Sequence, residues 1–234
     1  MKKKIVYYHP IPNAVCDIGN LNIPIKKNSD LSLKKTNVGK CPAWNHQNSR
    51  TFTYYSSSYF HLDYDQNAKI NYSNSLTQQE LNNSVDMVNN IDEEIFVYEL
   101  RYIFANFYWT DHKGIWISIL PHPLTALNNN FYHCGAWFNL SNWPRYVNIG
   151  AVVVDKNKPI IINRGDPLYT IKFHTENQNE SIDLVKKEID EKQFNTSLNK
   201  LKFVRTNHAS GFDYEKILFE ESKKSKCPFN FLWK

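Results

Sequence analysis

Runs of β-branched and aromatic residues recur along the chain, and within many of them apolar and polar positions alternate. Alternation with a period of two is typical of strands that bury one face, and Gly, Asn, Asp and Pro between the runs are typical of turns. The densest group spans residues 131–174, where we expect strands in FYHCGAWF, VNIGAVVV, KPIIIN and PLYTIKF. This pattern predicts a mainly β fold, either an antiparallel sandwich or a distorted barrel.

Three segments before this group add further strands. Residues 5–9 predict a first strand, and residues 51–65 predict two strands with a bend at a serine cluster. Residues 94–110 form the longest apolar and aromatic run, and the alternating segment GIWISIL follows it after a turn-like Asp-His-Lys-Gly sequence. We therefore expect a hairpin in which residues 114–120 pair back on the end of the longer run.

The sequence predicts that a helix begins near residue 77. Thr77 and Glu80 have the spacing of a capping box, in which each side chain satisfies a backbone N–H of the other. Leu81, Val85 and Val88 follow at helical spacing, so a short helix through these residues is expected.

The C-terminal part has a helical rather than a strand-like pattern. Residues 181–194 place their apolar positions on one helical face, and residues 212–225 predict a second helix. The sequence thus predicts a β-rich core over residues 1–175, with an irregular N-terminal arm over residues 10–48. A helical appendage over residues 176–234 is expected to pack on this core.

The composition narrows the class of protein. A chain of 234 residues with 15% aromatic residues can bury one sizeable core, and its net charge of +5 is moderate. Lysine carries most of the positive charge and asparagine is abundant, which indicates an AT-rich genome such as that of a phage. We expect no signal peptide, because the N-terminal segment MKKKIVYYHPIPN contains too few apolar residues. No apolar run approaches the ~20 residues of a membrane span. We expect a cytoplasmic protein, in the host cytoplasm for a phage protein, whose scattered cysteines are free thiols.

One set of residues has the pattern of an iron site. His61-x-Asp63 lies on an expected strand, so both side chains point to one side, and His174 lies at a distant strand end. The three resemble the His-x-Asp…His triad of double-stranded β-helix oxygenases, a likeness that implies Fe(II) and 2-oxoglutarate as cofactors. The sequence departs from that family after His174, because the basic residues that follow, Lys186 and Lys187, lie in an expected helix. The alternative is a strand whose His and Asp satisfy each other or face solvent.

A second likeness concerns the corner before PLYTI. Gly165 and Asp166 with this run resemble the strand-start segment of trimeric dUTPases and dCTP deaminases, and residues 135–145 resemble the substrate-loop region before it. The likeness implies a β-clip fold. The family's phosphate loop, its segment with the water-activating Asp and its glycine-rich arm are missing, and 7 glycines leave few backbone cradles for a triphosphate. It therefore implies a shared topology without nucleotide hydrolysis.

A cluster of aromatic, amide and charged residues is the candidate ligand-binding set. Aromatic faces beside a guanidinium suit stacking on a sugar or a base. The candidate residues are Trp137, Asn139, Trp143, Arg145, Arg164 and Asp166. The alternative is that residues 143–145 form a structural corner, with the Trp buried and the Arg paired to Asp166 or to a carbonyl.

Other charged and metal-ligating residues give weaker patterns. The lysine-rich stretches at residues 2–4, 26–40 and 223–226 can contact phosphate, but such runs are usually solvated surface, so nucleic acid is the less favoured partner. His133-Cys134 and the pair of Cys41 with His46 supply zinc ligand types without a complete set of four.

The expected function is binding or assembly rather than catalysis. Residues 41–63 and 135–173 together resemble an uncharacterised group of phage and bacterial proteins with an Arg-Gly-Asp-Pro strand start, which implies no known activity. We expect a phage-type accessory protein that contacts a protein partner or its own copy through aromatic surface and the apolar tail, residues 227–233. The alternative is the Fe(II)/2-oxoglutarate oxygenase.

Overall fold

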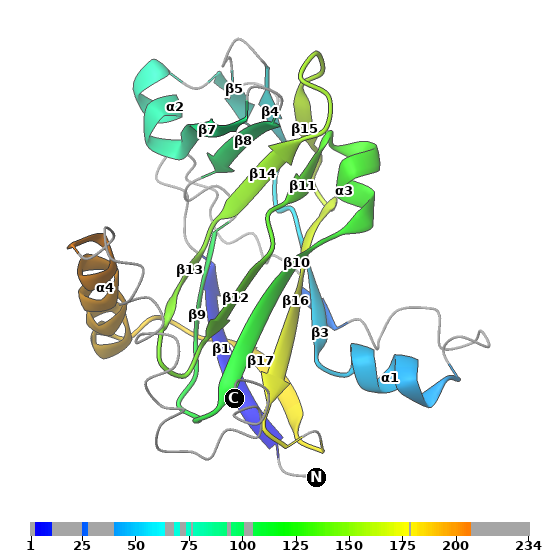
Figure 1. Ribbon diagram of the computed structural model, residues 1–234, viewed down its shortest axis with the longest axis vertical. Helices are drawn as coiled ribbons and strands as arrows, with labels where there is room; N and C mark the ends of the chain where they lie inside the picture. The colour runs from blue at the N-terminus through cyan, green and yellow to red at the C-terminus, as the bar shows by residue number, and fades with distance from the viewer. Residues whose placement is uncertain are drawn as a thin grey trace.

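The computed structural model describes residues 3–10, 25–27, 40–63, 68–70, 74–75, 77–92, 95–100, 105–177 and 179–206. Within these ranges the fold is mainly β, with antiparallel sheets packed as a sandwich, and none of the sheets closes into a barrel (Figure 1). No helix in the described part of the chain is long and apolar enough to cross a membrane.

The strands are β1 (Lys3–Pro10), β2 (Ile25–Lys27), β3 (Thr51–Tyr55), β4 (Phe60–Leu62), β5 (Ala68–Ile70), β6 (Asn74–Ser75), β7 (Val85–Asp92), β8 (Ile95–Leu100), β9 (Asn106–Trp109), β10 (Ile115–Pro121), β11 (Phe131–His133), β12 (Ala136–Asn139), β13 (Arg145–Val147), β14 (Ile149–Val153), β15 (Ile160–Ile162), β16 (Pro167–Thr175) and β17 (Ser181–Lys186). The helices are α1 (Pro42–Asn48), α2 (Gln78–Ser84), α3 (Pro123–Asn128) and α4 (Glu191–Thr206).

Two sheets form the body of the molecule. The larger has the order β12-β10-β16-β3-β2, and the second has the order β13-β9-β1-β17. In Figure 1, β10 and β16 lie in front of β1 and β9. Two smaller sheets, β11-β14-β8-β7 and β15-β4-β5-β6, extend the fold at its upper end in the same view.

Aromatic side chains fill the space between the layers. Tyr54, Tyr108 and Tyr169 come from three different strands and are fully buried, and the rings of Tyr54 and Tyr169 stack with centroids 4.9 Å apart. Asn106 donates from Nδ2 to the Tyr169 hydroxyl over 3.2 Å, which satisfies a polar group in the core. Each such ring contributes about 2–3 kcal/mol through the apolar area it removes from water.

The chain changes sheet at two junctions where the sequence predicts continuous strands. FYHCGAWF divides into β11 and β12, and VNIGAVVV divides into β13 and β14, so each pair of strands lies in two different sheets. His133 lies between the junctions: its Nε2 is 3.1 Å from the Asn148 carbonyl oxygen, and its Nδ1 contacts the Cys134 carbonyl. A neutral imidazole has one N–H, so it donates to one of these two oxygens. Cys134 N–H also donates to the Gly150 carbonyl over 2.7 Å.

The predicted hairpin between residues 94–110 and 114–120 is wrong. β9 pairs with β1 and β13, whereas β10 pairs with β12 and β16, so the two strands belong to different layers. Gly114 turns the chain between the layers with a φ of 68°, which glycine adopts at little cost. Ser141 fastens this turn, accepting from the Ile115 N–H over 2.8 Å and donating to the His112 carbonyl over 2.7 Å.

The helix predicted over residues 181–194 is also wrong. Residues Ser181–Lys186 form β17, which pairs in parallel with β1 from Lys3↔Ser181 to Tyr8↔Lys186. Helical spacing and strand alternation both place Ile182 on an apolar face, so the local pattern does not distinguish them. The strand forms because its backbone pairs with the edge of β1. The helix begins later, at Glu191, and the predicted second helix over residues 212–225 lies outside the described residues.

Other local predictions are confirmed. β1 covers the predicted first strand, and β3 and β4 flank a bend at the serine cluster. The Thr77–Glu80 capping box is complete, with Thr77 N–H donating to Glu80 Oε2 over 2.8 Å. Helix α2 ends at Ser84, however, and Val85 and Val88 belong to β7.

Candidate ligand-binding face

Alternation along β10 and β16 separates a buried face from an outer face of the larger sheet. Ile115, Ile117 and Ile119 of β10 are fully buried, whereas Trp116 and Ser118 between them are half-buried. On β16, Ile171 and Phe173 are likewise buried, and Lys172 and His174 alternate with them. The register places Trp116 opposite His174 and Ser118 opposite Lys172, so these four side chains share the outer face.

The edge strand β12 adds a second tryptophan to this face. Trp137 lies opposite Ser118 in the register, and its side chain is 52% exposed. The indole rings of Trp137 and Trp116 stack with centroids 4.3 Å apart and an interplanar angle of 15°. We call the group of Trp116, Ser118, Trp137, Lys172 and His174 the tryptophan face.

Polar groups beside the rings are ordered by hydrogen bonds. Ser118 Oγ and His174 Nε2 lie 2.8 Å apart, and Lys172 Nζ donates to Gln47 Oε1 of α1 over 2.5 Å. Burial lowers the pKa of His174, and the positive charges of Lys172 and Arg50 lower it further. The imidazole is therefore neutral at pH 7, and the positive charge beside the tryptophans comes from lysine and arginine.

The spacing of Ser118 and His174 suits a nucleophile and its general base, but their position in the sheet does not suit acyl transfer. Stabilising an oxyanion requires N–H donors directed at the reacting oxygen. β10 pairs with β12 on one side and with β16 on the other, in continuous register, so the backbone amides around Ser118 are used within the sheet. The backbone on both sides of Ser118 is therefore committed to the sheet.

Three of the predicted ligand-binding residues form a structural corner instead. Trp143 is 2% exposed and Asn139 is 4% exposed, and Asn139 Oδ1 accepts from the Asn142 N–H over 3.2 Å. The Arg145 guanidinium lies 4.2 Å from the centroid of the Trp143 ring, and Arg145 Nε donates to the Tyr146 carbonyl over 3.2 Å. Asn139 lies opposite Trp116 in the register but is buried, so Trp137 is the one member of the candidate set that is exposed on the tryptophan face.

Asp166 and Arg164 lie at a second corner, at the opposite end of β16 from His174. The Asp166 carboxylate accepts from Asn129 Nδ2 and from the Asn163 N–H, both over 2.7 Å. Gly165, with a φ of 90°, donates its N–H to the Ser56 carbonyl over 2.8 Å, so the corner is fastened to the serine bend. Asp166 is thereby committed to the turn, and Arg164 lies exposed beside it.

The structure does not bring the predicted iron ligands together. His61 Nε2 and Asp63 Oδ1 are in contact over 2.5 Å, and the Tyr59 hydroxyl lies 3.2 Å from His61 Nδ1. His174 lies on another sheet, where it is hydrogen-bonded to Ser118. Among the described residues no group of three or more His, Cys, Asp or Glu side chains is placed to hold a metal ion, and this includes the histidines and cysteines considered for zinc.

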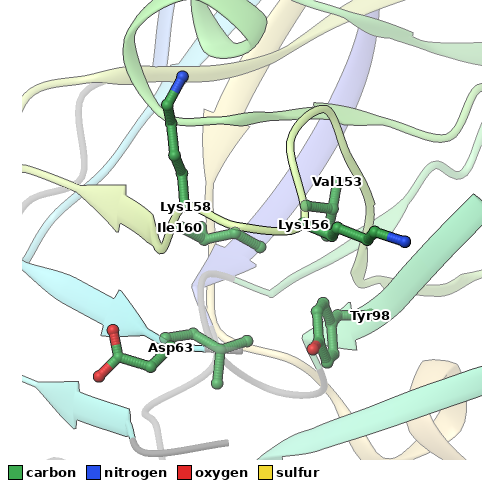
Figure 2. Close-up of a pocket in the computed structure, with 7 residues that line it drawn as sticks. Asp63, Tyr98, Val153, Lys156, Lys158 and Ile160 are labelled. Atoms are coloured by element: carbon green, nitrogen blue, oxygen red, sulfur yellow. The ribbon is translucent and has the colours of Figure 1, made fainter. Parts of the chain in front are cut away.

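The hollow beside Asp63 is too small for a substrate. It is lined by Leu62, Asp63, Tyr98, Val153, Lys156, Lys158 and Ile160, and its volume of about 10 Å³ is at the lower limit for a single water molecule. In Figure 2 the ammonium groups of Lys156 and Lys158 point away from the Asp63 carboxylate. These residues do not fit 2-oxoglutarate together with iron.

Sequence reasoning missed Trp116, Ser118 and Lys172. Their signal is the period-two alternation in GIWISIL and PLYTIKF, which assigns each of them to the polar side of its strand. Finding the site also requires knowing that β10 pairs with β16 and β12, and that pairing is not encoded locally. No family model and no curated protein matches the chain in sequence comparisons, so the functional argument rests on this geometry.

Proposed function

We propose that the protein acts by binding rather than by catalysis, and that the tryptophan face is its binding surface. The observation that carries this proposal is the stacked pair of Trp116 and Trp137, with Trp137 52% exposed on the outer face of a regular sheet. A large exposed ring held in a fixed orientation offers a platform on which a planar base or a sugar ring stacks. Stacking of this kind contributes about 1–3 kcal/mol for each ring that is bound.

The groups around the platform supply orientation. Ser118, His174 and Lys172 lie within one or two strands of Trp137, and together they present a hydroxyl, an imidazole and an ammonium group to a bound molecule. A few polar groups beside an aromatic surface are typical of sites that fix how a ligand lies. On the lysine- and asparagine-rich composition, we assign this role to an accessory protein of phage type that acts in the host cytoplasm.

The test compares Trp137→Ala with Tyr132→Ala, a control that removes an aromatic ring 43% exposed on a different sheet. Quenching of tryptophan fluorescence is titrated with an oligothymidylate, a neutral cello-oligosaccharide and an acidic peptide. We expect at least one probe to bind, and Trp137→Ala to weaken that binding by about tenfold or more. Tyr132→Ala is expected to bind within about twofold of the unmodified protein. Equal binding by both variants, or no binding of any probe, would contradict the proposal.

A further inference from the structure

The edges of the described sheets differ in how well they suit pairing with a further strand. The edge strands β2, β6, β11, β12, β13 and β15 have 4 residues or fewer. Edge strand β7 has 8 residues, but its register with β8 shifts between Val88 and Asp92. β17 has 6 residues and pairs with β1 without a shift. Shortness, bulges and proline are among the means by which edges avoid pairing with another chain, and β17 has none of these.

The backbone of β17 presents alternate residues to the side away from β1. Lys187, directly after the strand, donates its N–H to the Tyr8 carbonyl of β1 over 3.0 Å. The N–H and C=O of one residue point to the same side of a strand, and the side alternates, so those of Ile182, Leu184 and Lys186 point away from β1. In the described part of the chain no strand pairs with β17 on this side. The three residues therefore offer a row of donors and acceptors to a further strand.

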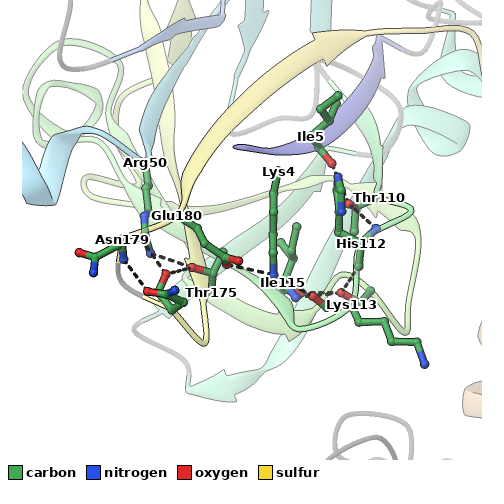
Figure 3. A network of polar contacts seen from close by, with 12 residues as sticks. Lys4, Ile5, Arg50, Thr110, His112, Lys113, Ile115, Thr175, Asn179 and Glu180 are labelled. Atoms are coloured by element: carbon green, nitrogen blue, oxygen red, sulfur yellow. Dashed lines mark hydrogen bonds and ion pairs between the residues drawn. The ribbon is translucent and has the colours of Figure 1, made fainter. Parts of the chain in front are cut away.

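The N-terminal end of β17 is held by a charged contact. Lys4 Nζ of β1 lies 3.0 Å from the carboxylate of Glu180, the residue before β17, and donates to the Lys113 carbonyl over 3.2 Å. Figure 3 shows the Lys4 side chain reaching toward Glu180 and the Lys113 backbone. The side chains of Lys4 and Glu180 are only 13% and 9% exposed. β17 is thus fixed in an extended conformation before a partner binds, which lowers the entropy cost of pairing.

The side chains of β17 divide between two faces. Ile182 is fully buried and Leu184 packs against the core. On the outer face, Val185 is 40% exposed and lies between Asp183 and Lys187 in the alternation. An exposed valine beside an unpaired row of backbone groups suits an apolar side chain of a neighbouring strand.

These features favour a second copy of the chain as the partner strand. Within the described ranges β17 is the edge strand with 6 residues in unbroken register, so two copies that pair through regular edges pair β17 with β17. A contact of this kind uses the same surface on both chains and has two-fold symmetry. Two identical edge strands that continue one sheet across a two-fold axis run antiparallel.

The side chains distinguish the possible positions of the axis. An axis beside Asp183 places two carboxylates opposite each other, and an axis beside Leu184 places Val185 opposite Asp183 of the second copy. An axis beside Val185 places the two valines opposite each other and Asp183 opposite Lys187 of the second copy. This last arrangement covers apolar surface and opposes no like charges.

We propose that two copies of the protein associate through their β17 strands, paired antiparallel about a two-fold axis beside Val185. The pairing joins two 4-stranded sheets into one, and Leu184 and Lys186 of opposite chains exchange backbone hydrogen bonds. One strand pair is a smaller contact than the about 1,200–2,000 Å² of a stable interface, so association is weak and depends on concentration. β17 and the tryptophan face belong to different sheets, so the contact is independent of the binding function proposed above.

Sedimentation velocity over a series of concentrations measures association of the full chain. Lys186→Pro is the informative variant, because it removes an outward N–H and leaves the bond between Lys187 and Tyr8 in place. Lys186→Gln is its matched control, since it removes the charge and keeps the N–H. Thermal unfolding of each variant verifies that it is folded.

We expect the unmodified protein to form a dimer as its concentration rises. Lys186→Pro is expected to weaken dimerisation by about tenfold or more, because each chain loses one hydrogen bond to the other. Lys186→Gln is expected to dimerise at least as tightly as the unmodified protein.

Cross-linking tests the position of the axis. Val185→Cys places two thiols in a directly opposite pair without hydrogen bonds between them, with Cα atoms about 4.5 Å apart, which is within the range that a disulfide spans. The control is Leu127→Cys, at a position 79% exposed on α3, and the unmodified protein with its 4 cysteines gives the background. Under mild oxidation we expect a covalent dimer of Val185→Cys well above that background and none above it for Leu127→Cys.

The proposal is overturned if the full chain is monomeric at every concentration, or if Val185→Cys is cross-linked no more than Leu127→Cys. It is also overturned if Lys186→Gln weakens dimerisation as much as Lys186→Pro, because the side chain and not the backbone would then form the contact. A dimer that persists in Lys186→Pro but is lost in a chain ending at residue 226 would assign the contact to the apolar tail instead of β17.

Discussion

At the scale of single residues, burial separates side chains that hold the fold from those available to a ligand. The protein contains aromatic and charged residues in both situations, and the sequence does not distinguish them: Trp137 and Trp143 lie six positions apart, yet their exposed fractions are 52% and 2%. The ion pairs differ in the same way. Lys4 and Glu180 have side chains only 13% and 9% exposed, whereas those of Lys3 and Asp183 are 62% and 38% exposed.

Removing the negative charge of Glu180 is expected to destabilise the fold. Glu180→Gln removes the carboxylate that pairs with Lys4 in a largely dry site, so we expect the free energy of unfolding to fall by about 3 kcal/mol. Asp183→Asn removes the partner of Lys3 from an exposed pair, and its effect is expected to stay below about 1 kcal/mol. Urea unfolding measures both variants. Similar losses for the two would mean that the Lys4–Glu180 pair is hydrated like the surface one.

Substitutions of Trp143 and Trp137 are expected to differ in their effect on stability. Trp143→Ala leaves a cavity beneath Arg145, and we expect a loss of about 3–5 kcal/mol in unfolding free energy. Trp137→Ala removes a half-exposed ring, and a loss of no more than about 1 kcal/mol is expected. Thermal and urea unfolding give both values. A larger loss for Trp137→Ala than for Trp143→Ala would assign the exposed ring a structural role.

At the scale of elements, local signals predict an element well where they also determine its partner. The capping box of α2 and the serine bend between β3 and β4 need no distant contact, and both are confirmed. The hairpin prediction failed because a Gly-containing turn looks the same whether the next strand returns to its own sheet or crosses to another. β17 was predicted as helix because its apolar spacing fits both periods, and pairing with β1 is a long-range contact.

The buried imidazole of His133, between the two strand junctions, leads us to expect that stability depends on pH. Burial lowers the pKa of His133, against the opposing effect of its contacts with the Cys134 and Asn148 carbonyls, and burial also lowers the pKa of His122 and of His174. Below pH 6.5 the unfolded chain therefore takes up protons that the folded chain does not. The stability that these neutral histidines contribute is expected to be complete above pH 6.5. The free energy of unfolding is expected to fall as the pH drops below 6.5.

Urea unfolding between pH 7.5 and 5.5 measures this dependence, and His133→Gln is the informative variant. We expect the variant to be less stable at pH 7.5 and to lose less stability on acidification than the unmodified protein. Stability that increases toward pH 5.5 would contradict this account. It would show that His133 donates to both carbonyl oxygens as an imidazolium.

At the scale of the whole molecule, the sandwich class is predictable from composition and alternation, but the order of strands is not. The sequence contains the alternation that gives each sheet its polar face, whereas the site exists only because β12, β10 and β16 are neighbours. The predicted iron site shows the converse. His61 and Asp63 are adjacent as their spacing requires, but no local pattern determines where His174 lies relative to them.

Assembly is a separate prediction at this scale. The apolar tail over residues 227–233 lies outside the described residues, and its composition favours contact with another chain or packing on the sheet. As a subunit contact, the tail makes the full chain an oligomer and a chain ending at residue 226 a monomer. Light scattering after size-exclusion chromatography measures both. A strictly monomeric full chain would exclude the tail as a subunit contact.

The most direct test of the binding function is to observe the indole N–H signals of the 6 tryptophans by two-dimensional NMR during titration with the oligothymidylate. Variants of single tryptophans assign each signal. The account predicts that the signals of Trp137 and Trp116 shift, while those of the buried Trp109 and Trp143 do not. Shifts that leave Trp137 and Trp116 unchanged and affect other tryptophans would contradict the claim that the tryptophan face binds the ligand.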